Sequence, residues 1–237
     1  MSEIRAITPN CYKKNFIHVP IIQTKEQSPS LNKNDFIEAQ FNWLTNETLK
    51  SALRELYYCK FDIKDVAKIE SMGLELPFSS GEEVVNFLAA KNVRINFENI
   101  KENDIHACYD FEKNVITINE RYKNTHSKPV ILAIASAILH EAGHAKDKDG
   151  ITSIQEELEC LALNSIAHRA FIRKNPDIFK NVAQPIIQDG VGLYSELFFE
   201  RPSSNDLALR VKIKYGELPV GCKKHKPSDL ALKIKYL

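Results

Sequence analysis

Apolar positions recur at three- and four-residue steps from Asp35 onward, which is the period of an amphipathic helix. Before this point the chain is polar and has no sustained period, so we expect an extended or partly ordered lead-in over residues 1–34. The pattern that follows predicts a helical N-terminal part over residues 35–92. Its helices are expected at residues 36–57, at residues 62–71 with Gly73 as the C-terminal cap, and through Lys91 after a capping box of Ser79 and Glu82.

The period then changes from helical to alternating. Val93, Ile95 and Phe97 are separated by polar residues, as in a strand with one buried face. Two further strands are expected at residues 105–111 and 115–119, joined by a turn. These strands predict a small sheet at the start of a core region.

Two long helices are expected after the sheet. Pro129 stands where a helix can begin, because a missing N–H costs nothing there, and an apolar face follows it. Gly150 is expected to end this segment, and a second helix runs from about residue 152 to residue 174. The order of elements predicts an α+β fold whose core region spans residues 93–200.

An internal repeat occupies the end of the chain, residues 201–237. Residues 206–215 and 229–236 both begin Asp-Leu-Ala-Leu and then alternate apolar with basic side chains. Alternation favours strands, so we expect a two-stranded basic appendage. The Pro-Ser pairs upstream of each copy could instead cap short helices, an alternative that the pattern leaves open.

Charge is balanced over the whole chain but not along it. Lys and Arg number 32 against 31 Asp and Glu, so the net charge favours no class of partner. From Arg201 onward we count nine basic and three acidic side chains. This segment, including the run from Lys223 to Lys226, could make weak contacts with nucleic acid or an acidic protein, although a solvated charged face is the more common role.

Cysteine content and hydropathy bear on the compartment. The five cysteines are odd in number and form no Cys-x-x-Cys pair, which is typical of a reduced compartment. The longest apolar run, residues 130–139, is about half as long as a membrane span. We therefore expect a cytoplasmic protein that makes no membrane contact.

The chemistry of the chain is concentrated in His140-Glu141-Ala142-Gly143-His144. On a helix, the two histidines lie one turn apart on the same face, so both imidazoles can reach one metal ion. Two imidazoles and one carboxylate leave a fourth tetrahedral position for water, as in catalytic zinc sites. Glu141 stands beside them and can accept the proton of that water.

The residues after the motif exclude one class of zinc peptidase. Metzincins continue with a Gly and a third His, where this chain has Asp147 and Gly150. The third ligand is therefore expected from the following helix, which offers Glu156, Glu157 and Glu159.

Helical geometry favours Glu157 among the three carboxylates. At 100° per residue, Glu157 falls with Asn164 and His168 among apolar side chains, and metal ligation explains such a polar stripe. We predict Glu157 as the third ligand and keep Glu156 and Glu159 as alternatives. The opposite, solvent side of the helix is expected to carry Gln155, Arg169 and Arg173.

With these residues the sequence resembles the gluzincin metallopeptidases, specifically the compact minigluzincin-like group. That group includes intracellular metallopeptidases that cleave phage or stress-response repressors. Its third ligand begins a Glu-x-x-Ala/Cys signature, in which the small residue allows close packing against the motif helix. Both Glu157 to Cys160 and Glu159 to Ala162 match this form. The Asn or Asp that often follows the small residue is replaced by Leu in both registers.

The resemblance spans residues 93–174 and implies a zincin-like fold. In such enzymes a strand pair precedes the motif helix, and its edge strand aligns the substrate backbone; residues 108–119 fit that order. The resemblance also implies Zn²⁺ as cofactor, a peptide or protein substrate, and a catalytic core over residues 93–200.

The function predicted from these residues is zinc-dependent peptide hydrolysis. Zinc held by His140, His144 and Glu157 would activate a water molecule, with Glu141 as the general base. The alternative is a regulatory or nucleic-acid-associated binding protein with a structural or degenerate metal site, which the basic C-terminus favours. Glu141 counts against this alternative, because a structural site needs no general base.

Other polar residues have two interpretations each. His168 or Tyr194 could stabilise an oxyanion, although a packed side chain is as common a role or commoner. Asp147 and Asp149 could orient His144 through its second ring nitrogen, although a solvated turn is the more common role.

Overall fold

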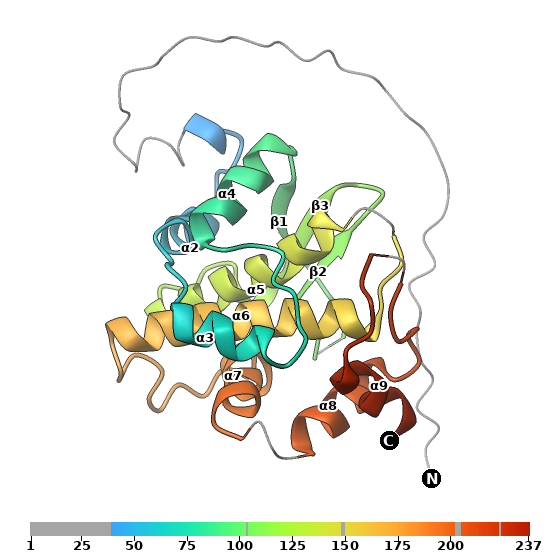
Figure 1. Cartoon of the computed structure of the whole chain (residues 1–237). Helices are drawn as coiled ribbons and strands as arrows, with labels where there is room; N and C mark the ends of the chain where they lie inside the picture. The colour runs from blue at the N-terminus through green and yellow to red at the C-terminus, as the bar shows by residue number, and fades with distance from the viewer. Residues whose placement is uncertain (1–38, 103, 148–149, 202–204, 223) are drawn as a thin grey trace.

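Two long helices, α5 (Lys128–Lys146) and α6 (Ile154–Lys174), pack against each other through the middle of the molecule (Figure 1). Most residues of both helices are buried. Apolar side chains on most faces of α5 account for its burial, whereas α6 also buries polar side chains, including Glu156, Glu157 and Glu159. Pro129 lies in the first turn of α5, as predicted, but the helix ends at Lys146 and its C-cap is Asp147 rather than Gly150. The predicted bounds of α6 agree with the structure to within two residues.

The computed structural model describes residues 39–102, 104–147, 150–201, 205–222 and 224–237. The predicted lead-in over residues 1–34 lies outside this described part of the chain. Within it, every helix is too short or too polar to span a membrane.

Three shorter helices, α2 (Glu47–Tyr57), α3 (Ile63–Glu70) and α4 (Gly81–Ala90), form the described N-terminal part. Within the helical pattern predicted over residues 36–57, α2 begins at Glu47, because Asn46 caps it by accepting hydrogen bonds from two backbone amides of its first turn. The predicted capping box is displaced by one residue. Ser80, rather than Ser79, caps α4 by accepting a hydrogen bond from the Glu83 amide.

The sheet has three strands in the order β1 (Arg94–Glu98), β3 (Val115–Asn119) and β2 (Ala107–Asp110). All five residues of β3 are buried, which suits the central position of this strand. It pairs antiparallel with β2 across the predicted turn and parallel with β1. Both β2 and β3 also contact α5, so the sheet is packed against the helix that carries the His-Glu-x-x-His motif.

The predicted basic strand pair at the end of the chain is wrong: both copies of the repeat are helices. They are α8 (Asp206–Tyr215) and α9 (Asp229–Tyr236). Each helix buries one face against the partner helix and α6, with Leu207, Ala208 and Val211 in α8 and Ala231 and Ile234 in α9. The apolar side chains of Leu209, Ile213 and Leu232 are exposed. Ser228 caps α9 by accepting a hydrogen bond from the Ala231 amide, so the helical alternative is correct for this copy.

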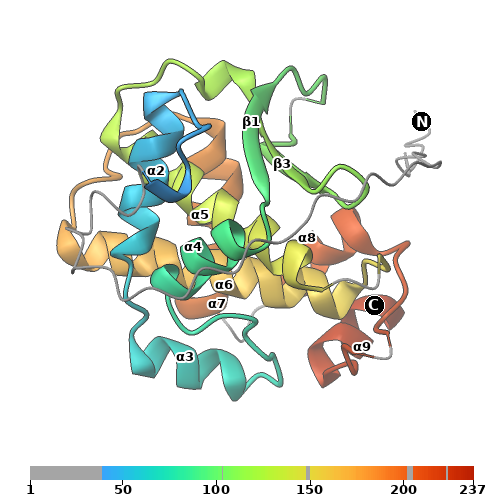
Figure 2. The same ribbon diagram turned by 90° about the horizontal axis from the view of Figure 1, so that it is seen from above.

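The elements surround the α5–α6 pair on two sides. Helix α2 and the sheet pack on α5, whereas α7 (Gly192–Phe199), α8 and α9 pack on α6 (Figures 1 and 2). A kinked segment, η2 (Ile186–Val191), precedes α7 and contacts both long helices. The described chain is therefore α+β, with the ligand-bearing helices at its centre.

Candidate metal centre

The two motif histidines and Glu157 converge between the long helices. His140 and His144 project from the last turns of α5 with their Nε2 atoms 3.2 Å apart. From the first turn of α6, Glu157 Oε2 lies 3.6 Å from His140 Nε2, and Glu157 Oε1 lies 3.6 Å from His144 Nε2. All three side chains are buried, so the predicted ligand set forms one group that can hold a metal ion.

The separations between these atoms suit a small tetrahedral cation. Ligand atoms about 2.0–2.1 Å from zinc lie roughly 3.3 Å from one another at tetrahedral angles. The observed separations of 3.2 and 3.6 Å are close to this value, and 3.6 Å is too long for a hydrogen bond. Glu157 Oε2 is buried and has no hydrogen-bond partner among the described residues. A cation between the three side chains would satisfy it.

Electrostatics at this site also favour a positive charge. Burial by itself raises the pKa of Glu157, but the adjacent His144 and His140 outweigh it and lower that pKa to about 2. Burial likewise opposes protonation of His144, but Cys160 and Glu157 hold the pKa of His144 well above its ordinary value. A buried carboxylate between two imidazoles therefore requires a proton or a metal ion for charge balance.

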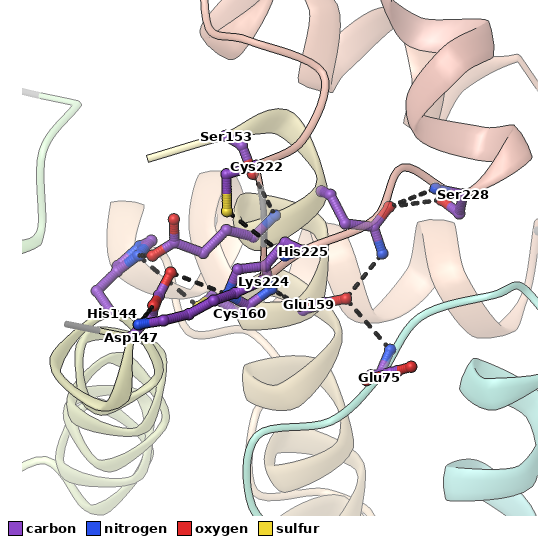
Figure 3. Close-up of polar contacts among 12 residues, drawn as sticks. Glu75, His144, Asp147, Ser153, Glu159, Cys160, Cys222, Lys224, His225 and Ser228 are labelled. Carbon is purple, nitrogen blue, oxygen red and sulfur yellow. Dashed lines mark hydrogen bonds and ion pairs between the residues drawn. The ribbon is translucent and has the colours of Figure 1, made fainter. Parts of the chain in front are cut away.

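The two alternative carboxylates are buried, but each contacts the Nδ1 atom of a histidine and neither belongs to the group of His140, His144 and Glu157. Glu156 Oε1 lies 2.7 Å from His144 Nδ1 and can only accept a hydrogen bond there, so it fixes the tautomer whose Nε2 lone pair faces Glu157. Glu159 Oε2 lies 2.7 Å from His225 Nδ1 in the same manner (Figure 3). Both side chains are as buried as that of Glu157.

Gln155 is also buried, contrary to its expected place on the solvent side of α6. Its Nε2 donates to Glu159 Oε1 over 2.7 Å, and its Oε1 accepts from the Ser228 amide and hydroxyl. The C-terminal segment covers this face of α6, which sequence periodicity within α6 cannot reveal.

The close contact of the two ligand helices depends on Gly143. A Cβ atom at this position would lie 2.5 Å from the Sγ of Cys160, well inside van der Waals contact. Cys160 Sγ itself lies 3.9 Å from His144 Nδ1. The small residues at 143 and 160 therefore let α6 approach closely enough for Glu157 to reach both histidines.

Glu141 is buried beside the ligand histidines and faces groups from two other elements. Cys108 on β2 is exposed, but partial desolvation of its thiol raises its pKa to about 11, and the charge of Glu141 adds to this effect. Burial also raises the pKa of Tyr215 well above its usual range, and the charges of Glu157 and Glu141 add to this effect. The Tyr215 phenol therefore lies within electrostatic range of both carboxylates.

Tyr215 was missed by sequence reasoning, because its segment was expected to be a strand. Each copy of the repeat ends in Tyr, but Tyr236 is 80% exposed, whereas Tyr215 ends α8 next to the metal centre. Only the packing of α8 on α6 distinguishes the two tyrosines.

The other candidate residues occupy different positions. His168 lies three turns along α6 from Glu157, about 16 Å by helical rise, and packs on the ring of Phe179. Tyr194 is nearer: burial raises its pKa to about 12, and the charge of Glu157 contributes. Asp147 contacts His225 and Lys224 rather than His144, and Asp149 lies outside the described residues.

No family model matches the chain. Comparisons with curated proteins and with solved structures also find no significant match. The resemblance to gluzincins stays a prediction, and the assignment of the centre rests on its geometry and chemistry.

Proposed function

We propose that the chain is a zinc-dependent peptidase with a zincin-like core. The observation that carries the proposal is the convergence of His140 Nε2, His144 Nε2 and the Glu157 carboxylate, with Glu141 next to them on the same helix. Two imidazoles and one carboxylate form a donor set of catalytic zinc, which keeps a position open for water.

Zinc bound at this centre would supply a Lewis acid and lower the pKa of a bound water from 15.7 to about 7. The Glu141 carboxylate accepts a proton from the attacking water and delivers it to the nitrogen of the leaving amine. Glu156 holds His144 by its Nδ1 proton, which keeps Nε2 directed at the centre. Glu141 thus transfers the proton, and Glu156 orients the imidazole of His144.

Tyr215 is proposed to stabilise the negative charge that develops on the carbonyl oxygen. Because burial raises its pKa well above the usual range, the phenol keeps its proton at neutral pH and remains a hydrogen-bond donor. Its position beside Glu157 and Glu141 brings that donor to the reacting atoms.

An extended peptide suits the strand beside the centre. Strand β2 is an edge strand of the described sheet. The charge of Glu141 contributes to the raised pKa of Cys108 on this strand, so the strand lies near Glu141. A peptide that pairs with this edge would bind through main-chain hydrogen bonds, with little demand on side-chain sequence. This geometry supports peptide hydrolysis over hydrolysis of a small molecule.

The basic C-terminus gives little support to a nucleic-acid role. Lys224 contacts Asp147, Lys233 donates to Asn205, and Lys235 donates to two backbone carbonyls. Because these cations bind acceptors of the same chain, we propose no nucleic-acid function.

Hydrolysis of a peptide mixture by the zinc-loaded chain tests the proposal. Mass spectrometry of a diverse pool of unstructured peptides should detect new termini with the wild type, and Glu141→Gln should lower the rate about 10²- to 10⁴-fold while it retains zinc. Glu120→Gln, at an exposed position, serves as the control and should cleave at the wild-type rate. Equal cleavage by Glu141→Gln, or none by the wild type, would contradict a peptidase.

A further inference from the structure

A second group of metal-binding side chains lies where the C-terminal segment crosses the end of α5. It consists of Asp147, Cys222 and His225, whose ligand atoms all lie within 4.8 Å of one another (Figure 3). Asp147 caps α5, and the other two belong to the connection between α8 and α9. These residues take no part in the centre described above.

His225 is held in the way that metal-ligating histidines are held. Its Nδ1 lies 2.7 Å from Glu159 Oε2, a carboxylate that can only accept, so Nδ1 carries the proton. His144 has the same arrangement with Glu156, one turn earlier on α6. In each case the buried carboxylate leaves Nε2 of the histidine directed at a second acid, which for His225 is Asp147 at 2.9 Å.

Asp147 has one oxygen available to this group. Its Oδ1 lies 2.8 Å from Lys224 Nζ, whereas its Oδ2 is buried and makes no hydrogen bond within the described chain. The carboxylate is only 5% exposed, so water does not readily solvate it. With Nδ1 of His225 protonated, Nε2 and Oδ2 lie 2.9 Å apart, so either a proton or a metal ion must lie between them.

Cys222 completes the group from a tight turn. The amide of Cys222 donates to the carbonyl of His225, and the amide of His225 donates to Cys222 Sγ over 3.4 Å. An amide that donates to sulfur stabilises a thiolate, which is the form that binds metals. The turn places sulfur and imidazole of a Cys-x-x-His sequence on the same side.

We propose that Asp147, Cys222 and His225 bind a second zinc ion, with water as the fourth ligand. Sulfur, imidazole nitrogen and carboxylate oxygen are all zinc donors, and tetrahedral zinc requires separations of about 3.3–3.6 Å among them. All three ligand atoms lie within 4.8 Å of one another, and the 2.9 Å between His225 Nε2 and Asp147 Oδ2 would have to lengthen by about 0.4 Å on zinc binding.

The second ion would fix the segment that follows Tyr215. The same segment pairs with the start of α6, where the amides of Ile154 and Gln155 donate to the carbonyls of Pro219 and Val220. Zinc between Asp147 and His225 would tie this segment to α5 as well. The second site is thus a structural one, which holds α8 over the first.

Elemental analysis and cobalt spectra of the full chain test the second site. The wild type, reconstituted with zinc and desalted, should retain about two ions, and Cys222→Ser should retain about one. In a His140→Ala/His144→Ala variant, which lacks the first site, Co²⁺ should still produce a thiolate-to-cobalt charge-transfer band. Adding Cys222→Ser to that variant should abolish the band, whereas adding Cys108→Ser, the matched control, should leave it.

These measurements test the second zinc site independently of the proposed peptidase activity. A thiolate band that depends on Cys222 supports the site even when no peptide is cleaved. One zinc per wild-type chain, with no Cys222-dependent band in wild type or double variant, would overturn it. In that case His225 carries a proton instead, as the Glu159 hydrogen bond, which raises the pKa of His225 to about 9, would allow.

Discussion

Substitution of Gly143 by Ala should separate the two ligand helices. The added methyl group would lie 2.5 Å from Cys160 Sγ, whereas ordinary contacts begin near 3.4 Å. Roughly 0.9 Å must therefore be gained by movement of α5, α6 or the sulfur. Because Cys160 is 1% exposed and its sulfur is only two bonds from the Cα atom, the sulfur has little room to move. We expect most of the displacement to fall on the helices, and hence on the reach of Glu157 to His140 and His144.

The magnitude follows from two opposing effects. Overpacking a buried contact lowers the free energy of unfolding by about 1–3 kcal/mol, whereas the higher helix propensity of Ala than of Gly raises it by about 1 kcal/mol. The net loss of stability is therefore about 0–2 kcal/mol. Metal affinity should fall further, because a displacement of about 0.9 Å exceeds the tolerance of about 0.5 Å that a preorganised site allows.

A double-mutant cycle with Cys160→Ala isolates the contact. Stability is measured by urea denaturation of the metal-free chain, and zinc affinity by competition with a chelator. Cys160→Ala removes the sulfur that the new methyl group would contact. It should therefore restore much of the stability and of the zinc affinity, with a coupling free energy of at least about 1 kcal/mol between the two substitutions. Additive effects of the two substitutions would refute the proposed close contact.

Three further substitutions probe other parts of the site and core. Tyr215→Phe should lower kcat about 10²-fold and leave zinc content unchanged, measured by peptide hydrolysis and elemental analysis; an unaltered kcat would exclude the phenol from catalysis. Glu156→Gln should weaken zinc about 10- to 100-fold in chelator competition, because the amide cannot replace the carboxylate at His144 Nδ1; wild-type affinity would contradict this role. Burial and the nearby Arg169 lower the pKa of His168 to about 4, below its ordinary 6.5, so the folded state binds fewer protons between these values. Stability is then lost as pH falls through this window, by about 3 kcal/mol at pH 4, and His168→Leu should escape that loss in urea titrations at pH 7 and pH 4.

Local sequence signals predicted the elements that form the first centre. The spacing of His140 and His144 on a helix, and the position of Glu157 on the buried arc of the next, were sufficient to predict that these three side chains lie together in a group that could hold a metal ion. Strand β3 was predicted at its observed bounds, because a run of β-branched residues, Val115 to Ile118, follows a strong turn. In each case the deciding interactions are close in sequence or follow from helical period.

Other features depend on contacts that one segment cannot encode. The repeat was predicted as strands because a few alternating residues also fit one helical face, and only packing on α6 decides between them. The roles of Glu156 and Glu159 depend on which histidines approach them, and His225 is 66 residues from its carboxylate. Tyr215 was missed for the same reason, since nothing near it in sequence indicates the metal centre.

The most direct test of the account is zinc affinity at the first centre, measured by chelator competition in a Cys222→Ser background. Wild-type ligands should bind about one zinc, Glu141→Gln should bind it with little change, and Glu157→Gln should weaken it strongly. Glu196→Gln, at an exposed carboxylate on α7, provides the control. Full affinity in Glu157→Gln, or no zinc in the background chain after reconstitution, would contradict a metal centre formed by His140, His144 and Glu157.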